Sequence, residues 1–280
     1  MVLNREIVLI HGTWCDGNVW GEFATGLRQM GYKVHTPSFR YHDLPYQECL
    51  AKVGTVTLQD YRDDLVALIE SLDQPPLILG HSLGCLVAQM VAEKTEVAGM
   101  ILMGPAPTAD IFAFYPTMLA CFGKHFLRWG FWKKAMPPYK KEFFKYCMNE
   151  QEESLKEEVF ADLVPESGKV YTQMALHWFD KTKAAYVDFS QISCPVLVIS
   201  GTKDKMTHPN IARRTAKNYR DSVLVSLTGA DHMYESGKFQ QKTLKVIKGW
   251  SQQNGFCGLV TKHNQKKVWK VIPAFFSFVF

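Results

Sequence analysis

Residues 77–90 read LILGHSLGCLVAQM, and this stretch decides the fold. An apolar run typical of a buried strand passes, through the residues GHSLG, into a run typical of a helix. The motif G-x-S-x-G at such a join predicts a tight turn that holds Ser82 in a strained backbone conformation, with its hydroxyl above the sheet. Gly80 and Gly84 must be small because strand and helix pass close together there. The turn also places Ser82 near a helix N-terminus, where amide N–H groups can receive negative charge.

The rest of the chain repeats this alternation of strand and helix. Apolar runs predict strands at residues 6–12, 32–37, 75–81, 97–105, 194–201 and 222–229, and helical spacing predicts helices at 19–30, 57–72, 83–94, 210–218 and 237–250. Strands rich in Val, Ile and Leu that alternate with helices indicate a mostly parallel sheet covered by helices on both faces. The predicted fold class is therefore α/β.

The alternation stops between about residues 108 and 190, where aromatic residues are frequent and no strand-like run is found. We expect a helical cap inserted between two strands. Residues 1–107 and 190–258 would then form the core, residues 108–189 the cap, and residues 259–280 a basic and apolar tail. The alternative is an ordinary extension of the core. An insertion after the strand at 97–105 would overhang the carboxyl ends of the strands, where open α/β sheets bind ligands.

Composition narrows the class of protein further. The chain has 280 residues, of which 47% are hydrophobic, enough for a sizeable core. Its seven cysteines are an odd number, widely scattered and without a C-x-x-C pair, which argues against a disulfide framework or a structural zinc site. The apolar run Ile7 to Ile10 is too short for a signal peptide or a membrane span. We expect a reduced, cytoplasmic location.

The net charge of +5 is concentrated at the end of the chain. Lys262, Lys266, Lys267 and Lys270 lie in the last stretch, which has no acidic residue, and without these four the net charge is about +1. The remainder is close to balance, so the sequence predicts no nucleic-acid partner.

Three further motifs occur in an informative order. HGTWCDG at residues 11–17 follows the first predicted strand, SGTKDKM at 200–206 follows a late one, and TGADHMY at 228–234 follows the last. Together with GHSLG, these motifs make the chain resemble the α/β-hydrolase superfamily from Arg5 to about Gly255. The order Ser82, Asp204, His232 is that of this superfamily.

The resemblance implies a role for each residue. Ser82 would be the nucleophile, His232 its base and Asp204 the group that orients His232, because a serine hydroxyl is a poor nucleophile until a base takes its proton. The backbone N–H groups of Thr13 and Leu83 would form the oxyanion hole.

Other residues compete for these roles or flank them. Asp231, beside the histidine, and Asp110, after an earlier strand, are alternatives for the acid. His11 and His81 flank functional positions, where they more often orient loops than react.

The motifs are similar to those of the plant methylesterase and hydroxynitrile lyase branch. Lyases there tend to replace the glycine that follows the first histidine and to carry a lysine after the catalytic histidine, whereas this chain has Gly12 and Met233, as the esterases do. The resemblance implies a hydrolase of carboxylic esters that works through an acyl-enzyme, without metal or cofactor. Alternatives are a lipase, lysophospholipase or thioesterase acting at a membrane surface, and a non-catalytic receptor on the same fold.

The substrate is expected to be a small apolar ester or acyl compound, because aromatic residues crowd the cap. The residues expected to contact it are Trp14, His81, Phe112, Phe114, Trp129 and Met233. Lysines interleave with aromatics in the cap and precede the apolar run VIPAFFSFVF in the tail, so both segments are candidates for peripheral membrane contact. The sequence leaves open the natural substrate and the oligomeric state.

Overall fold

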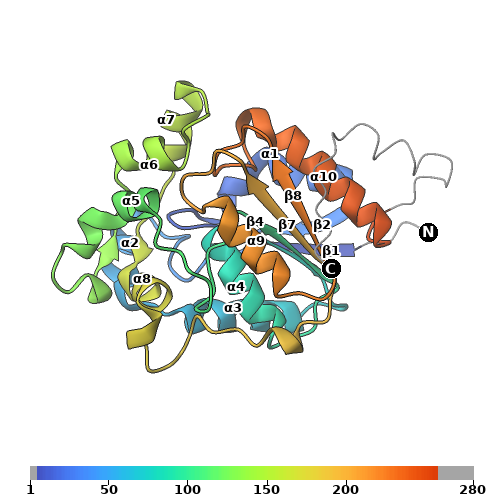
Figure 1. Ribbon diagram of the computed structural model, residues 1–280, viewed down its shortest axis with the longest axis horizontal. Coiled ribbons are helices and arrows are strands. Elements are labelled where there is room, and N and C mark those ends of the chain that lie inside the picture. The colour runs from blue at the N-terminus through green and yellow to red at the C-terminus, as the bar shows by residue number, and fades with distance from the viewer. Residues whose placement is uncertain (1–4, 258–280) are drawn as a thin grey trace.

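The protein has a six-stranded parallel sheet at its centre (Figure 1). The computed structural model describes residues 5–257. In sequence order the strands are β1 Arg5–Ile10, β2 Tyr32–His35, β3 Leu77–His81, β4 Gly99–Met103, β7 Val196–Gly201 and β8 Ser222–Leu227. Their order across the sheet is β2-β1-β3-β4-β7-β8, and every neighbouring pair is parallel. The predicted α/β fold class is confirmed.

Helices cover both faces of this sheet (Figure 1). Helices α1 (Gly21–Gln29) and α10 (Gln240–Gln253) lie on one face, and α3 (Leu58–Glu70), α4 (Leu83–Ala92) and α9 (Pro209–Lys217) on the other. Because side chains alternate along a strand, Ile7 and Leu9 of β1 pack with the first set and Val8 with the second. Among residues 5–257, no helix combines the length and apolar character that crossing a membrane requires.

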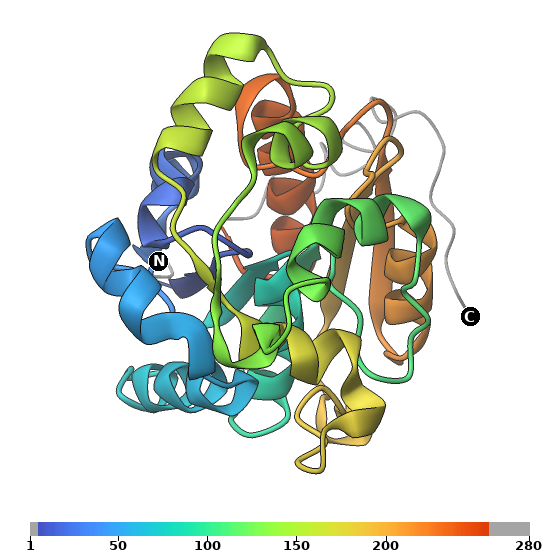
Figure 2. The same ribbon diagram turned by 90° about the vertical axis from the view of Figure 1, so that its left-hand side faces the viewer.

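The segment between β4 and β7, which we call the cap, lies on the left in Figure 1 and faces the viewer in Figure 2. Its helices are α5 (Pro116–Phe126), α6 (Lys140–Tyr146), α7 (Glu153–Ala161) and α8 (Gly168–Ala175). The expectation that no strand occurs here is wrong, because β5 (Ala135–Met136) pairs antiparallel with β6 (Glu166–Ser167). Strands of two residues are too short to leave an alternating pattern in the sequence.

Shorter elements complete the described chain. Helix α2 (Tyr46–Lys52), which the sequence analysis does not predict, follows β2. The 3-10 helices are η1 Gly17–Trp20, η2 Val53–Thr55, η3 Phe131–Lys133, η4 His177–Phe179, η5 Phe189–Gln191 and η6 Gly237–Phe239. The predicted tail at residues 259–280 lies outside the described residues.

Candidate active site

Ser82 lies at the corner between β3 and α4 with φ 53° and ψ −118°. Such a conformation is rare for a residue with a side chain, and the surroundings enforce it. A Cβ atom on Gly80 would lie 2.5 Å from the carbonyl oxygen of Gly84, and one on Gly84 would lie 2.1 Å from the carbonyl oxygen of Ile10. Only glycine fits at either position, so strand and helix can approach closely and hold the serine between them.

His232 is held by a buried carboxylate. Its Nδ1 lies 2.9 Å from Oδ2 of Asp204, and both side chains are almost fully buried. Asp204 also accepts hydrogen bonds from the backbone N–H groups of Met206 and Thr207 and from the hydroxyls of Thr207 and Tyr234. These contacts fix the carboxylate, which in turn fixes the orientation of the imidazole.

The charges of this pair support one another. Burial works to raise the pKa of Asp204, but the charge of His232 and the hydrogen bonds outweigh it, so this pKa lies below its ordinary value. Burial works to lower the pKa of His232, but Asp204 outweighs it and raises the pKa above its ordinary value of 6.5. The pair therefore stabilises an imidazolium, the state that His232 would enter on taking a proton.

The two alternative acids are engaged elsewhere. Asp231 accepts hydrogen bonds from the backbone N–H of Glu150 at 2.9 Å and from the side chain of Gln151 at 3.0 Å, so it connects the histidine loop to the cap. Asp110 is exposed and accepts a hydrogen bond from the hydroxyl of Thr108. Among the three candidate acids, it is Asp204 that lies within hydrogen-bond distance of the His232 imidazole.

The loop after β1 lies directly beside Ser82. A Cβ atom on Gly12 would lie 3.1 Å from Cβ of Ser82, a tight contact, so glycine lets the loop approach the serine without displacing its neighbours. His11 supports the loop, with its Nδ1 2.9 Å from the carbonyl oxygen of Gly12 and its Nε2 accepting a hydrogen bond from the backbone N–H of Phe39. The hydroxyl of Thr13 lies 2.8 Å from that of Tyr171, a residue of cap helix α8.

His81 contacts the backbone of His232. Its Nε2 lies 2.9 Å from the carbonyl oxygen of His232, and its Nδ1 lies 3.4 Å from Oε1 of the buried Glu235. Burial, with the charge of His232, lowers the pKa of His81 to about 3, and burial raises the pKa of Glu235 to about 7. A neutral His81 that donates through Nε2 has an acceptor at Nδ1, so Glu235 is best accommodated in its protonated form.

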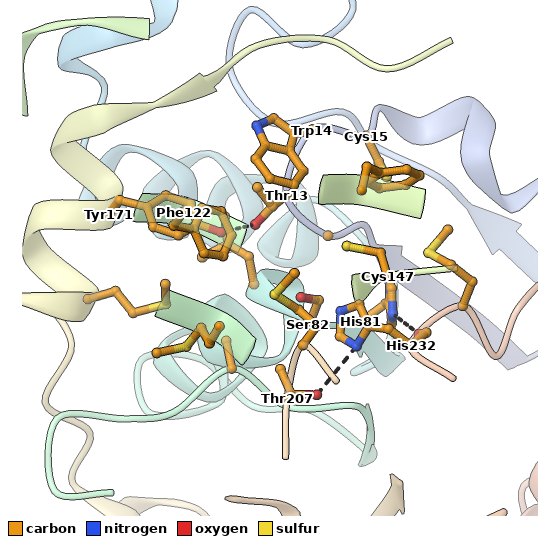
Figure 3. Close-up of a pocket in the computed structure, with 18 of the residues that line it drawn as sticks. Thr13, Trp14, Cys15, His81, Ser82, Phe122, Cys147, Tyr171, Thr207 and His232 are labelled. Carbon is orange, nitrogen blue, oxygen red and sulfur yellow. Dashed lines mark hydrogen bonds between the residues drawn. The ribbon is translucent and has the colours of Figure 1, made fainter. Parts of the chain in front are cut away.

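A cavity of about 40 Å³ opens over Ser82, between the core and the cap (Figure 3). Figure 3 shows Ser82 near its centre, with Thr13, Phe122 and Tyr171 toward one side and His81, Thr207 and His232 toward the other. Leu83 also lines the cavity. Apolar and sulfur-containing side chains dominate the remaining lining, namely Met118, Phe143, Cys147, Met174, Met206 and Met233. The cavity thus combines an apolar lining with the polar groups of Ser82 and His232, as small-molecule sites commonly do.

Three of the six predicted substrate contacts, Trp14, His81 and Met233, line this cavity. Trp14 is fixed by a hydrogen bond from its Nε1 to the carbonyl oxygen of Met136. The other three do not line it. Trp129 is 86% exposed on the outer surface of the cap, and Phe112 and Phe114 line a neighbouring cavity.

Sequence reasoning assigned no role to Thr207, Tyr171 or Tyr234. Tyr171 contacts Thr13, 158 positions earlier in the chain, and no local pattern signals such a contact. Thr207 and Tyr234 each lie within a few residues of a predicted site residue, so a search for hydroxyls near Asp204 and His232 would have found them. No group of three metal-ligating side chains is found within residues 5–257.

Comparison with known proteins identifies the family. A model of the alpha/beta hydrolase family matches residues 7–236. The chain belongs to this family.

More specific similarities are partial or distant. A carbendazim-hydrolyzing esterase from Nocardioides sp. (strain SG-4G) is 34% identical over 90 residues, which are 32% of this chain and 36% of that esterase, so the similarity spans about a third of the relative. A monoacylglycerol lipase from Paleococcus ferrophilus superposes with a TM-score of 0.66 at 22% identity, over 89% of this chain and 94% of the other. Polyneuridine aldehyde esterase superposes with a TM-score of 0.64 at 16% identity, over 87% of this chain and 99% of the esterase. At these identities the structures support the fold.

Proposed function

We propose that this chain is a serine hydrolase that cleaves carboxylic esters through an acyl-enzyme. The observation that carries the proposal is the hydrogen bond that holds Nδ1 of His232 against Asp204, while His232 and Ser82 line the same cavity. Because Nδ1 is occupied, Nε2 is the nitrogen left to take the proton of the serine hydroxyl. The similarity to esterases and a lipase supports the same class of reaction.

The reaction follows the chemistry of these groups. As His232 takes its proton, Oγ of Ser82 attacks the ester carbonyl carbon and a tetrahedral intermediate forms. Its negative oxygen would be stabilised by the backbone N–H groups of Thr13 and Leu83, and one such donor is typically worth about 3 kcal/mol. His232 then protonates the leaving alcohol, and the acyl group stays on Ser82. Water, activated by the same histidine, releases the acid and restores the serine.

A panel of p-nitrophenyl esters tests this proposal. The wild-type protein should hydrolyse at least one of them, and the Ser82→Ala variant should lose on the order of 10⁴-fold in kcat while keeping its fold. A thioester and a lactone in the same panel would show whether the acyl bond must be an ester.

A second candidate, hydrolysis of lipid esters at a membrane surface, is favoured by one observation. Leu127 and Trp129 are 88% and 86% exposed at the outer end of the cap, and Arg128, Lys133 and Lys134 are exposed beside them. Rings and leucines can enter the acyl boundary while cations meet anionic headgroups. We name this group of five residues the cap tip. The tail that the sequence analysis also links to membranes lies outside the described residues.

A further inference from the structure

A second cavity, of about 230 Å³, lies next to the candidate active site. It is formed by residues 107–109 and 111–114 after β4, by Met118 of α5, and by the end of α8 with η4. In Figure 2 these cap segments, green and yellow, lie on the side that faces the viewer. None of the three catalytic candidates Ser82, Asp204 and His232 lines this second cavity.

The lining suits an uncharged, apolar ligand. Among the described residues that form it there is no Asp, Glu, Lys or Arg, and most are aliphatic or aromatic. Of its polar groups, the hydroxyl of Thr108 already donates to Asp110, and Nδ1 of His177 is buried without a hydrogen-bond partner among the described residues. Transfer of a hydrocarbon chain from water into such a space is favourable in proportion to the apolar area removed from water.

The two cavities share a wall. Pro107, Met118 and Met174 line both of them. Methionine side chains are unbranched and adapt their shape readily, so two of the three residues in this wall can move aside for a chain that passes from one cavity to the other.

Aromatic rings mark the outer side of the second cavity. Phe112 is 57% exposed and Trp178 is 52% exposed, and both belong to the lining. The ring centroid of Phe114 lies 5.6 Å from that of Trp178, so the two sides of the cavity meet in an aromatic contact. Exposed rings at the edge of an apolar cavity are costly in water unless something apolar covers them.

We propose that the second cavity binds the distal part of a long, unbranched apolar chain of the ester whose carbonyl group lies at Ser82. The inference rests on the proposed function and narrows its substrate class to esters with a chain long enough to pass Met118 and Met174. The chain can belong to the acid or to the alcohol of the ester, since both would be apolar.

A larger side chain placed on helix α8 would fill the second cavity and so test the proposal. Ala175, the last residue of α8, lines it, and Ala175→Phe would place a ring inside. The matched control is Ala161→Phe, at the exposed end of α7, which lines neither cavity. The kcat/KM values are measured for p-nitrophenyl butyrate and dodecanoate, and for ethyl and dodecyl acetate. The first pair varies the acid and the second the alcohol.

In the wild type, kcat/KM should rise by about fourfold for each added methylene group that becomes buried, in the acid pair, the alcohol pair or both. In each pair that shows this rise, Ala175→Phe should lower the ratio of long-chain to short-chain kcat/KM at least tenfold. Ala161→Phe should leave the ratio at its wild-type value. An unchanged ratio in Ala175→Phe, with Ser82-dependent cleavage of the short ester intact, would overturn this inference and leave the proposed function standing.

Direct binding keeps the test independent of hydrolysis. The fluorescence of dansyl-undecanoic acid is titrated with the wild type and both variants, and folding is checked by thermal unfolding. Binding that weakens at least tenfold in Ala175→Phe alone supports the site even if no ester is cleaved, whereas equal affinity in all three proteins contradicts it. If Ala175→Phe does not fold, Ala113→Leu, in the opposite wall, takes its place.

Discussion

Nδ1 of His232 lies 2.9 Å from Asp204, whereas the adjacent Asp231 turns its carboxylate to Glu150 and Gln151 of the cap. Substitution of the two aspartates should therefore affect activity differently. Asp204→Asn should lower kcat on the order of 10⁴-fold, because the imidazole loses the acceptor that fixes its tautomer. Asp231→Asn should remain within about tenfold of wild type. Steady-state kinetics on one ester measures both, and a larger loss in Asp231→Asn would assign the acid to Asp231 instead.

The pH dependence should report His232. Only its neutral form can take the proton of Ser82, so kcat/KM should rise with pH as His232 deprotonates. Because Asp204 raises the pKa of His232, the midpoint should lie above the ordinary histidine value of 6.5. In Asp204→Asn, the midpoint of the residual activity should move to lower pH. A profile that is flat between acid and neutral pH would show that no histidine acts as the base.

The tight turn at Ser82 and the order of the motifs could be predicted from the sequence for a physical reason. Strand, tight turn and helix are local, and the glycines that the turn needs stand within two residues of Ser82. The parallel sheet likewise follows from apolar runs that alternate with helical spacing, and the structure confirms it.

Contacts between the core and the cap could not be predicted in this way, because they join residues far apart in the sequence. The hydrogen bond between Thr13 and Tyr171 joins residues 158 positions apart. The aromatic residues of the cap could be counted, but the direction of each could not be predicted. Trp129 follows the end of α5, where the chain leaves the helix and the helical period no longer assigns a face.

Glu235 predicts a pH-dependent stability. Burial raises its pKa from 4.5 to about 7, so the folded protein holds a proton that the unfolded chain releases. Its contribution to the free energy of unfolding is fully present below about pH 4.5 and is lost as pH rises toward 7, by on the order of 3 kcal/mol.

The variant Glu235→Gln tests this account, because its amide does not titrate and has nearly the size of the protonated carboxyl group. Urea unfolding at pH 5 and pH 8 should show a smaller loss of stability in the variant than in wild type. The same loss in both proteins would mean that Glu235 is ionised in the fold at both pH values.

The cap tip predicts membrane binding. The double variant Leu127→Ser, Trp129→Ser should co-sediment less with anionic liposomes than wild type, because two apolar side chains no longer enter the acyl boundary. High salt should release the wild-type protein, since the cationic residues contribute through screened attraction. Hydrolysis of a water-soluble ester should be unchanged, because neither side chain lines the cavity over Ser82. Equal sedimentation of the two proteins would exclude the cap tip as the contact.

If Ser82 is an activated nucleophile, a fluorophosphonate probe should label it covalently, and peptide mass spectrometry should locate the label. We expect one labelled serine, Ser82, with labelling lost in Ser82→Ala and blocked by prior incubation with a cleavable ester. Turnover of that ester in the same sample separates an enzyme from a receptor that retains the pocket. Absence of label on Ser82, together with ester hydrolysis that persists in a folded Ser82→Ala protein, would contradict the account.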